Sequence, residues 1–411
     1  MKTLSKSRFV SGVQCEKKLW YSYYRKDLQL PTDEQTQAIF DLGHQIGNLA
    51  QNRFPNGKDA TPEDFSDFSP SIEKTKLWIA EEVETIYEAT FTAKNALCML
   101  DILHRMNDEV WAIEVKNSTS VKDYHLTDAS LQYFVMKEAG YAPDKFFLMH
   151  INNQYIKNGE LTDEFFHLED ITDKVLSKQT WVEENLERLL VMLENKQEPN
   201  VSIGAHCSSP FACDFVHHCW KHIPENSVFE LYRGGNKAWE LYKQGILKIE
   251  DIEDDFPLTH FQHLQRKGLR NQEQYINKEA IKNMISSWQF PLYFFDFETV
   301  FPAIPVLDGT RPYQQVPFQY SLHILEEDGK LSHKEFLAHP EDFSNGKNPL
   351  KLLVEQLKQD FGTEGNIVTY NQSFEVARLN ELANMFPEDA PFLKNLVSRV
   401  VDLLPVFQGG F

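Results

Sequence analysis

Residues 98–116, CMLDILHRMNDEVWAIEVK, constrain the fold of this chain more than any other stretch. Two runs of strand-forming residues are joined by a polar turn at residues 107–108, and this pattern predicts a β-hairpin. Side chains in a strand point alternately to its two faces, so Glu114 and Lys116 project together. Asp101, on the partner strand and flanked by apolar residues, can face them. An isolated Glu-Val-Lys is usually a solvated strand face, and this upstream acid makes that interpretation less fitting.

The charged side chains of the hairpin predict a metal-dependent hydrolytic site. Two neighbouring carboxylates repel each other and are costly to take out of water unless a divalent cation lies between them. Lys116 is placed to orient or deprotonate a water molecule, or to neutralise charge that builds up on a phosphate. We expect Mg²⁺ or Mn²⁺ here, with Asp101 and Glu114 as ligands.

This pattern resembles the PD-(D/E)xK nuclease superfamily, in which an acid on one strand is followed by Glu-x-Lys on the next. The resemblance extends to Glu88, one strand earlier, and to Gln132 on the following helix, where RecB-like members place a glutamine. It implies a restriction-endonuclease-like α/β domain in which Glu88, Asp101 and Glu114 hold metal. The lysine of the motif, Lys116, would assist the attacking water.

The sequence departs from the family pattern at two positions. RecB-like members often carry a His in an early helix at a Gly-x-x-x spacing, whereas Gly43 is followed at that spacing by Gly47, and His44 is out of register. The family motif Gln-x-x-x-Tyr has Met136 in place of the Tyr. These departures leave open a catalytically inactive protein that keeps a nuclease fold to bind nucleic acid or to act as an adaptor.

Apolar periodicity and turn residues divide the chain into three parts. We expect a nuclease domain at residues 1–225, a helical connector at 226–288 and a second α/β domain at 289–411. Within the first part we expect helices at 5–24, 33–54 and 180–193, strands at 85–91, 96–104, 110–116 and 146–151, and a helix with Thr127 or Asp128 as its N-cap and Gly140 just past its end. The connector is expected to be broken at Gly234, Gly235, Gly245, Pro257 and Gly268. In the last part we expect strands at 292–299 and 366–370, a hairpin around Gly329, and helices at 350–361 and 373–385.

Three of the five cysteines, Cys207, Cys213 and Cys219, lie within the stretch CSSPFACDFVHHC. In a reducing compartment, clustered thiols are more often metal ligands or redox groups than disulfide partners. A tetrahedral zinc or a cubane iron-sulfur cluster needs a fourth ligand. Cys15 is the natural candidate, while Cys98 on the hairpin strand is expected to be a small core residue.

One cysteine near the N-terminus and three after the nuclease core resemble the iron-sulfur RecB-like nucleases. In those proteins a [4Fe-4S] cluster joins the two ends of the nuclease domain. The five-residue gap between Cys213 and Cys219 matches their pattern, whereas the gap before it, also of five residues, is longer than the two residues usual in those proteins. Zinc therefore stays an alternative to the cluster, and His206, His217 or His218 stays an alternative ligand.

A second pair of acids lies on a strand that we expect to be buried, PLYFFDFET at residues 291–299. Asp296 and Glu298 alternate along it and so point to one face, and the segment IVTYNQSFE brings Asn371 and Glu375 nearby. The pattern resembles the DnaQ-like exonucleases, which have an RNase H fold. It implies a two-metal Mg²⁺ or Mn²⁺ site held by these acids, for phosphodiester hydrolysis.

The DnaQ-like domain is expected to be truncated. In that family a Tyr or His precedes a final Asp by four or five residues on a late helix. This third motif should lie beyond residue 402, and the chain ends at Phe411. We therefore expect the second site to be catalytically incomplete.

The net charge of −20 argues against an attraction of the whole chain to nucleic acid, but its first 26 residues are basic and rich in aromatic residues. Cations among flat rings suit single-stranded nucleic acid, because bases stack on the rings while phosphates pair with the cations. The alternative is a basic amphipathic helix whose aromatic rings belong to the core. The candidate nucleic-acid contacts are Lys6, Arg8, Lys17 and Lys18.

The whole chain resembles a bacterial family that fuses a RecB-like iron-sulfur nuclease to a DnaQ-like domain. This resemblance implies a metal-dependent deoxyribonuclease that acts on single strands or ends, in DNA repair, recombination or defence. The basic N-terminal segment disfavours an enzyme for small phosphoesters. No apolar stretch approaches the ~20 residues that span a bilayer, and the N-terminus lacks an apolar signal core. We therefore expect no membrane partner and a cytoplasmic location.

Overall fold

The computed structural model describes residues 2–344 and 347–408. The chain divides into two compact units, one formed by residues 1–155 and 160–222 and the other by residues 156–159 and 223–411. Residues 226–288, expected as a separate connector, belong to the second of these units. Residues 409–411, at the end of the expected DnaQ-like domain, lie outside the described part of the chain. Both units combine helices with a mixed β-sheet, so the chain belongs to the α/β class.

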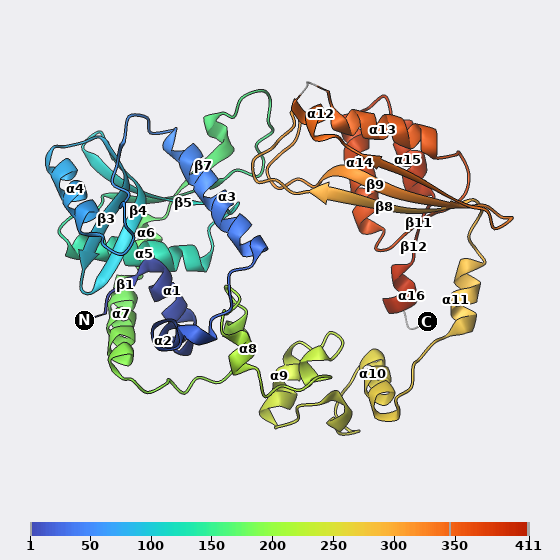
Figure 1. Cartoon of the computed structure of the whole chain (residues 1–411), viewed down its shortest axis with the longest axis horizontal. Helices are drawn as coiled ribbons and strands as arrows, with labels where there is room; N and C mark the ends of the chain where they lie inside the picture. Colours follow the sequence, from blue (N-terminus) through green and yellow to red (C-terminus); the bar gives the residue numbers. More distant parts are fainter. Residues whose placement is uncertain (1, 345–346, 409–411) are drawn as a thin grey trace. The chain divides into compact units, whose positions relative to one another are not determined.

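The first unit contains a seven-stranded sheet, in blue to green in Figure 1. Its strands follow the order β2-β3-β4-β5-β6-β7, and β1 pairs with β4 outside this path. Neighbours among β3, β4 and β5 are antiparallel, and β6 runs parallel to β5. The strand bounds are β1 Leu4–Ser5, β2 Lys58–Asp59, β3 Thr85–Ala93, β4 Ala96–Met106, β5 Glu109–Lys116, β6 Lys145–Ile151 and β7 Phe166–Asp170.

The helices of this unit agree with most of the sequence-based expectations. They are α1 Lys6–Gln14, α2 Glu16–Tyr24, α3 Glu34–Gln51, α4 Ser69–Ala80, α5 Asp123–Glu138, α6 Thr172–Leu176, α7 Gln179–Glu194 and α8 Val216–Cys219, with short 3₁₀ turns at Lys26–Leu28, Asp163–Phe165 and Ala205–Cys207. The expected strands at 85–91, 96–104, 110–116 and 146–151 and the helices at 33–54 and 180–193 are confirmed.

Two local predictions in this unit are wrong. The helix expected at residues 5–24 breaks at Cys15, whose backbone is extended with φ −162° and ψ 117°. The helix expected to begin at Thr127 or Asp128 begins at Asp123 instead, so Asp128 lies inside α5 and is buried. Gly140 does follow the end of α5, with the positive φ of 90° that glycine adopts easily.

One edge of β4 is paired with different strands at its two ends. β1 pairs with Ala96 and Leu97, whereas the ladder with β5 runs from Met106 only as far as Ile102. Between these two ladders, residues 98–101 pair with neither strand on this edge, and residues 114–116 of β5 pair with β6 and not with β4. The sheet is therefore split at this point, and the split leaves room for side chains next to Asp101.

The second unit holds a five-stranded sheet, in orange to red in Figure 1, with the order β10-β9-β8-β11-β12. β8, β9 and β10 form an antiparallel meander, and β11 and β12 run parallel to β8. The strands are β8 Leu292–Val300, β9 Val316–Leu325, β10 Leu331–Leu337, β11 Ile367–Thr369 and β12 Val400–Asp402. The helices are α9 Asn236–Lys243, α10 His260–Asn271, α11 Lys278–Ile285, α12 Pro340–Ser344, α13 Pro349–Asp360, α14 Ser373–Met385, α15 Ala390–Ser398 and α16 Leu404–Gln408, with 3₁₀ turns at Val228–Glu230 and Ile249–Asp251.

The expected elements of the second α/β domain are confirmed, including the hairpin at Gly329, whose φ is 86°. Gly268 is a correction, because it lies within α10 and does not interrupt it. Aromatic and aliphatic side chains of β8, β9, α13 and α14 form a buried core in this unit. In neither described range, 2–344 or 347–408, is any helix both long enough and apolar enough to cross a membrane.

Candidate active site

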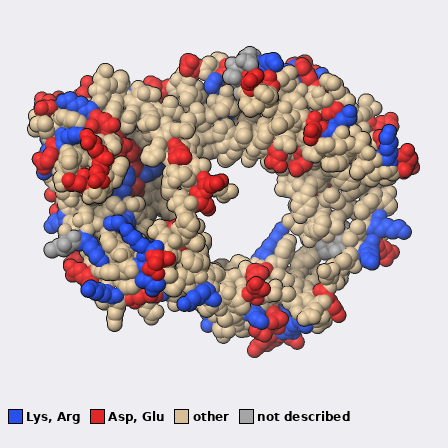
Figure 2. All heavy atoms as spheres, in the orientation of Figure 1, with Lys and Arg blue, Asp and Glu red and all other residues tan. Residues whose placement is uncertain are grey.

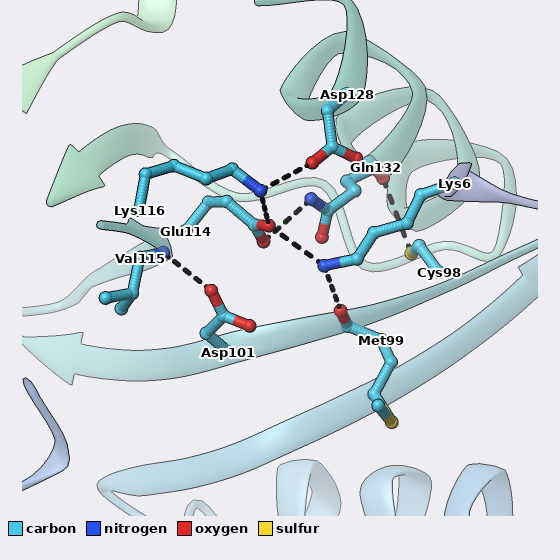
Figure 3. A network of polar contacts seen from close by, with 9 residues as sticks. All are labelled: Lys6, Cys98, Met99, Asp101, Glu114, Val115, Lys116, Asp128 and Gln132. Atoms are coloured by element: carbon cyan, nitrogen blue, oxygen red, sulfur yellow. Dashed lines mark hydrogen bonds and ion pairs between the residues drawn. The ribbon is translucent and has the colours of Figure 1, made fainter. Parts of the chain in front are cut away.

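Glu114 lies at the centre of a polar network in the split of the first sheet (Figure 3). Its Oε1 atom accepts hydrogen bonds from the ammonium groups of Lys6, at 2.9 Å, and Lys116, at 2.6 Å. Its Oε2 atom accepts one from the side-chain amide of Gln132, at 2.8 Å. Lys116 also donates to Asp128, at 2.8 Å. The Glu114 carboxylate is thus fully hydrogen-bonded although the residue is only 1% exposed.

Two consecutive elements, β5 and α5, and the distant helix α1 supply these side chains. Glu114 and Lys116 share one face of β5, as the alternation of a strand predicts. Asp128 and Gln132 are four residues apart in α5 and so lie on one face of that helix. Lys6 is the first residue of α1.

Asp101 closes the split from the side of β4. Its Oδ2 atom accepts a hydrogen bond of 2.6 Å from the backbone N–H of Val115, a donor that lies just beyond the β4–β5 ladder. The backbone carbonyl of Met99 accepts one of 3.2 Å from Lys6 in the same gap. Side chains therefore take up backbone groups that a continuous ladder would otherwise pair.

Glu88 completes the acidic group from β3, where its neighbours Tyr87 and Ala89 pair with the residues on either side of Asp101 in β4. Its φ is 54°, in the left-handed region that residues other than glycine seldom adopt. Such conformations persist only where the surrounding structure enforces them, and they cluster at functional sites. The backbone thus carries strain at the position that brings a third carboxyl group to Asp101.

The acids at this site differ in how well they are compensated. Burial and the charge of Asp101 raise the pKa of Glu88 to about 8. Burial and the charge of Glu114 raise the pKa of Asp101 to about 6. Burial also disfavours the charged form of Glu114, but Lys116 and Lys6 outweigh it and hold its pKa well below the usual range. Glu88 is therefore mostly protonated at neutral pH, and Glu88 and Asp101 are the two acids whose charged forms are least well compensated.

Two residues of this network, and a third close to it, were not expected there from the sequence. Lys6 was expected on a nucleic-acid-binding surface, and it lies inside the site. Asp128 was expected as a helix cap, and it pairs with Lys116 instead. His125, on α5, is buried, and burial and the charge of Lys116 lower its pKa to about 4. The spacing of Asp128 and Gln132, four residues apart on one helix, was a signal that could have identified Asp128.

The four cysteines expected as metal ligands line one pocket, together with Lys17, Lys18, Tyr21 and His206. Cys15 reaches it from the break between α1 and α2, Cys207 and Cys213 from the loop before α8, and Cys219 from the end of α8. His217 and His218, the other alternative ligands, are not among the residues that line this pocket. Cys98 lies in the hydrophobic core of the first unit, as expected.

Burial favours the neutral form of three thiols of the pocket, Cys15, Cys213 and Cys219. Burial raises the pKa of Cys15, of Cys219 and of Cys213, the last to about 11, and the charge of neighbouring thiols adds to the effect. Hydrogen bonds from the backbone N–H groups of Lys17 and Lys18, at the start of α2, favour a thiolate at Cys15. In the described part of the chain, no group of three or more His, Cys, Asp or Glu residues is arranged to hold a metal ion as it stands.

The basic N-terminal segment is largely committed to internal contacts. Trp20 and Tyr21 pack in a core with Phe215 and Cys213, so the alternative of core aromatic rings is confirmed for these two. Lys18 is buried.

The other two basic candidates also have partners. Lys17 pairs with Glu198 at 3.1 Å, and Arg8 donates to the hydroxyl of Tyr23 at 2.9 Å. Figure 2 shows Lys and Arg side chains gathered over α1 and α2, with acidic side chains beside them.

The second unit brings acids together at the ends of β8 and β12. Asp296 and Glu298 are exposed and alternate with buried phenylalanines along β8. Glu375, near the start of α14, is 2% exposed, and its Oε2 atom is buried without a hydrogen-bond partner. Burial and the charges of Asp296 and Asp402 raise the pKa of Glu375 to about 7.

Asp402 is a member of this group that sequence reasoning missed. It ends the short strand β12, beside Thr369 of β11. Its carboxylate accepts hydrogen bonds from the backbone N–H groups of Asn371, at 2.9 Å, and Gln372, at 3.2 Å. Asp402 thus anchors the turn before α14, and it places its charge close to Glu375. The apolar pair before it, Val-Val, was the sequence signal for this strand.

Comparisons with known proteins bear on part of the second unit. A family model described as "Domain of unknown function (DUF2779)" matches residues 293–411. The chain is 32% identical over 121 residues to "Uncharacterized protein MG366 homolog" of Mycoplasma pneumoniae, and the match covers 28% of this chain and 18% of that protein. It is 30% identical over 136 residues to "Uncharacterized protein UU173" of Ureaplasma parvum, covering 31% and 19%. The chain thus matches less than a fifth of the length of these relatives.

A solved structure, "Crystal structure of SSO0001", is similar at 14% identity with a TM-score of 0.27, covering 53% of this chain and 86% of that one. This TM-score is too low to bear on the fold. The names of these proteins state no activity. A functional proposal for the chain therefore rests on its own residues.

The raised pKa of Glu88 predicts a pH-dependent stability of the metal-free protein. The folded pKa, about 8, lies above that of an unfolded glutamate. The native state therefore binds more protons than the unfolded state between about pH 4.5 and pH 8, and its free energy of unfolding falls as the pH rises through this window. Glu88→Gln should reduce this fall.

Urea denaturation in the presence of a chelator, at several pH values from 5 to 8.5, measures the effect. Glu84→Gln is the matched control, because Glu84 lies just before β3 and is exposed. If the free energy of unfolding depended on pH equally in wild type and in Glu88→Gln, Glu88 would not be the group that keeps its proton in the folded protein.

Proposed function

We propose that this chain is a divalent-metal-dependent nuclease that hydrolyses DNA phosphodiester bonds. One observation carries the proposal. Carboxyl groups from three adjacent strands, Glu88, Asp101 and Glu114, lie together at the split of the first sheet, Glu114 buried and the other two partly buried, and of the three only Glu114 is hydrogen-bonded by lysines. Buried like charges are costly, and a divalent cation relieves that cost.

The donor set fits Mg²⁺ or Mn²⁺, because carboxylate oxygens are the ligands these ions prefer. Asp101 and Glu88 would hold the ion together with Glu114. When bound there, the ion would polarise an oxygen of the phosphate and activate a water molecule for attack. Gln132 keeps Glu114 in position through its second oxygen.

Lys116 acts as a cation in this scheme. Burial lowers the pKa of its ammonium group, but the charges of Asp128 and Glu114 outweigh burial and raise it. A protonated Lys116 orients the water and stabilises the negative charge that develops on the phosphate, and it does not remove a proton. The sequence left open whether Lys116 deprotonates the water or neutralises charge on the phosphate. The acids around Lys116 keep it protonated and so favour the second role.

Strand topology supports the two families that the sequence resembles. In the first unit, an antiparallel β3-β4-β5 meander followed by α5 and the parallel strand β6 is the connectivity of the PD-(D/E)xK core. In the second unit, counting β8 as the first strand, the sheet order is 3-2-1-4-5, which is that of the RNase H fold. Both likenesses are analogies of fold, and the activity is argued from the residues.

We also propose a second metal-binding site, of the DnaQ-like kind, at Asp296, Glu298, Glu375 and Asp402. The buried oxygen of Glu375 that lacks a partner is the observation in its favour. Carboxylates from β8, α14 and β12 provide a donor set suited to the same ions. Catalytic incompleteness of this site stays a prediction.

Single-stranded DNA or DNA ends are the proposed substrates, because the N-terminal segment sets cations beside aromatic rings, with Lys2 over Tyr24 and Arg8 over Tyr23. The rival is a protein that binds nucleic acid without cutting it. Metal-dependent cleavage separates the two, since a binding protein would retain DNA without shortening it.

Substitutions in the first site should abolish cleavage. In the full chain carrying Asp296→Asn, which removes the second site, Asp101→Asn or Lys116→Ala should lower the rate of Mn²⁺-dependent DNA cleavage by about 10²-fold or more. Single-turnover cleavage of an end-labelled oligonucleotide measures the rate.

The matched control is Asp108→Asn, in the turn of the same hairpin, where asparagine tolerates the positive φ of 67°. It should cleave at the wild-type rate. Full activity in either site variant, or cleavage that persists in a chelator, would refute the assignment.

The cysteine pocket is proposed to hold a [4Fe-4S] cluster, with zinc as the alternative. Four thiols from two distant segments are a donor set suited to either. Protein purified without oxygen should be brown and contain about four iron atoms per chain. Cys15→Ser should lose the iron and lower the Tm, because the metal links α1 and α2 to the loop before α8.

Cys98→Ser is the control for a general effect of losing a thiol, since Cys98 lies in the core away from the pocket. It should keep the metal. A colourless protein that contains one zinc per chain would show that the pocket holds zinc and not an iron-sulfur cluster. A protein that contains neither metal would rule out a metal site in this pocket.

A further inference from the structure

Lys6 reaches the first site from outside the strands and the helix that carry the other site residues. The two-residue strand β1 lays Leu4 and Ser5 along Ala96 and Leu97 of β4. The chain then turns into α1, whose N-terminus Ser5 caps by accepting a hydrogen bond from the backbone N–H of Arg8. This path brings the Lys6 ammonium into the split, within 2.9 Å of Glu114 and 3.2 Å of the Met99 carbonyl.

The helix that carries Lys6 is firmly packed. Phe9 is fully buried, and its ring meets Trp181 of α7 edge to face at 6.1 Å. Gly12 lies so close to α7 that a Cβ atom there would stand 2.7 Å from a methyl group of Leu189. α1 is therefore packed against α7 at two points along its length, and this packing fixes the base of the Lys6 side chain.

Two lysines donate to the same oxygen of Glu114, which is more than charge compensation of one carboxylate requires. Lys116 has a second acceptor in Asp128, toward which it can turn. Lys6 has its second acceptor in the backbone of β4, at Met99, away from Asp128. The two ammonium groups also repel each other. The arrangement favours Lys6 as the fixed partner of Glu114 and Lys116 as the one that leaves it.

We infer that Lys6 is a positioning residue of the proposed nuclease: it holds the Glu114 carboxylate in place while Lys116 turns from that carboxylate to the scissile phosphate. The inference rests on the proposed function. Lys6 and Gln132 together keep a donor on each oxygen of Glu114 during this exchange. Without Lys6, Lys116 would have to serve Glu114 and the phosphate at once.

The inference predicts a loss in kcat and not in substrate binding. Lys6→Met keeps the length and apolar stem of the side chain and removes its charge and donors. It should lower kcat for Mn²⁺-dependent cleavage of single-stranded DNA about tenfold or more, with KM and the salt dependence of binding unchanged. Lys6→Arg should recover part of the rate, because a guanidinium group can donate to both Glu114 and Met99. The variants are made in the full chain carrying Asp296→Asn.

Lys2→Met is the matched control. Lys2 belongs to the same N-terminal segment, but it donates to the Leu193 carbonyl and lies over the ring of Tyr24. It should leave kcat unchanged. Thermal denaturation accompanies each assay, and the comparison is made between variants that are folded at the assay temperature.

Three results would overturn the inference. An unchanged kcat in Lys6→Met leaves the nuclease in place and removes the role of Lys6. If kcat stays constant while KM rises and DNA binding depends less on salt, Lys6 contacts a phosphate of the substrate instead. A loss of rate in Lys6→Met that tracks a lower Tm and that Lys6→Arg does not relieve makes it a structural residue. If the Asp296→Asn chain with the first site intact does not cleave, the proposed function of this site fails, and the role of Lys6 fails with it.

Discussion

The structure of the first unit depends on the burial of carboxylates where the sheet splits along β4. A continuous antiparallel ladder would have paired residues 98–101 with β5, and no polar side chain would have been needed there. Because β5 stops pairing with β4 after Ile113 and continues beside β6 alone, backbone groups of β4 and β5 lose their ladder partners, and Asp101 and Lys6 take them up. The acids then need compensation, which lysines from β5 and α1 provide in part.

The N-terminal helix α1 links this site to the cysteine pocket. Lys6, at its first position, donates to Glu114, and Cys15, directly after its last residue, lines the pocket with the three later cysteines. The break at Cys15 has a physical role, because the extended residue directs its thiol to the start of α2, where backbone N–H groups favour a thiolate. A metal held in the pocket would therefore stabilise the helix that places Lys6.

Much of the first site could be predicted from local pattern. Strand alternation was sufficient to place Glu114 beside Lys116, and the polar turn was sufficient to put Asp101 on the partner strand. The same logic placed Asp296 and Glu298 on β8. It did not find Asp128, because a mid-helix acid that pairs with a lysine on a strand has the same local signature as an N-cap. It missed Asp402 because a three-residue strand carries too little periodicity to be recognised.

Sequence by itself determined the residues that carry the chemistry: the acids and the lysine on the hairpin, and one cysteine near the N-terminus with three more clustered at residues 207–219. Their local spacing follows from the geometry of strands and turns, which depends only on neighbouring residues. Tertiary structure alone decided that Lys6 points into the site, that Trp20 and Tyr21 belong to the core, and that Glu88 adopts a strained backbone. These outcomes depend on contacts between residues about a hundred positions apart, or on the packing of whole elements, and no local pattern records them.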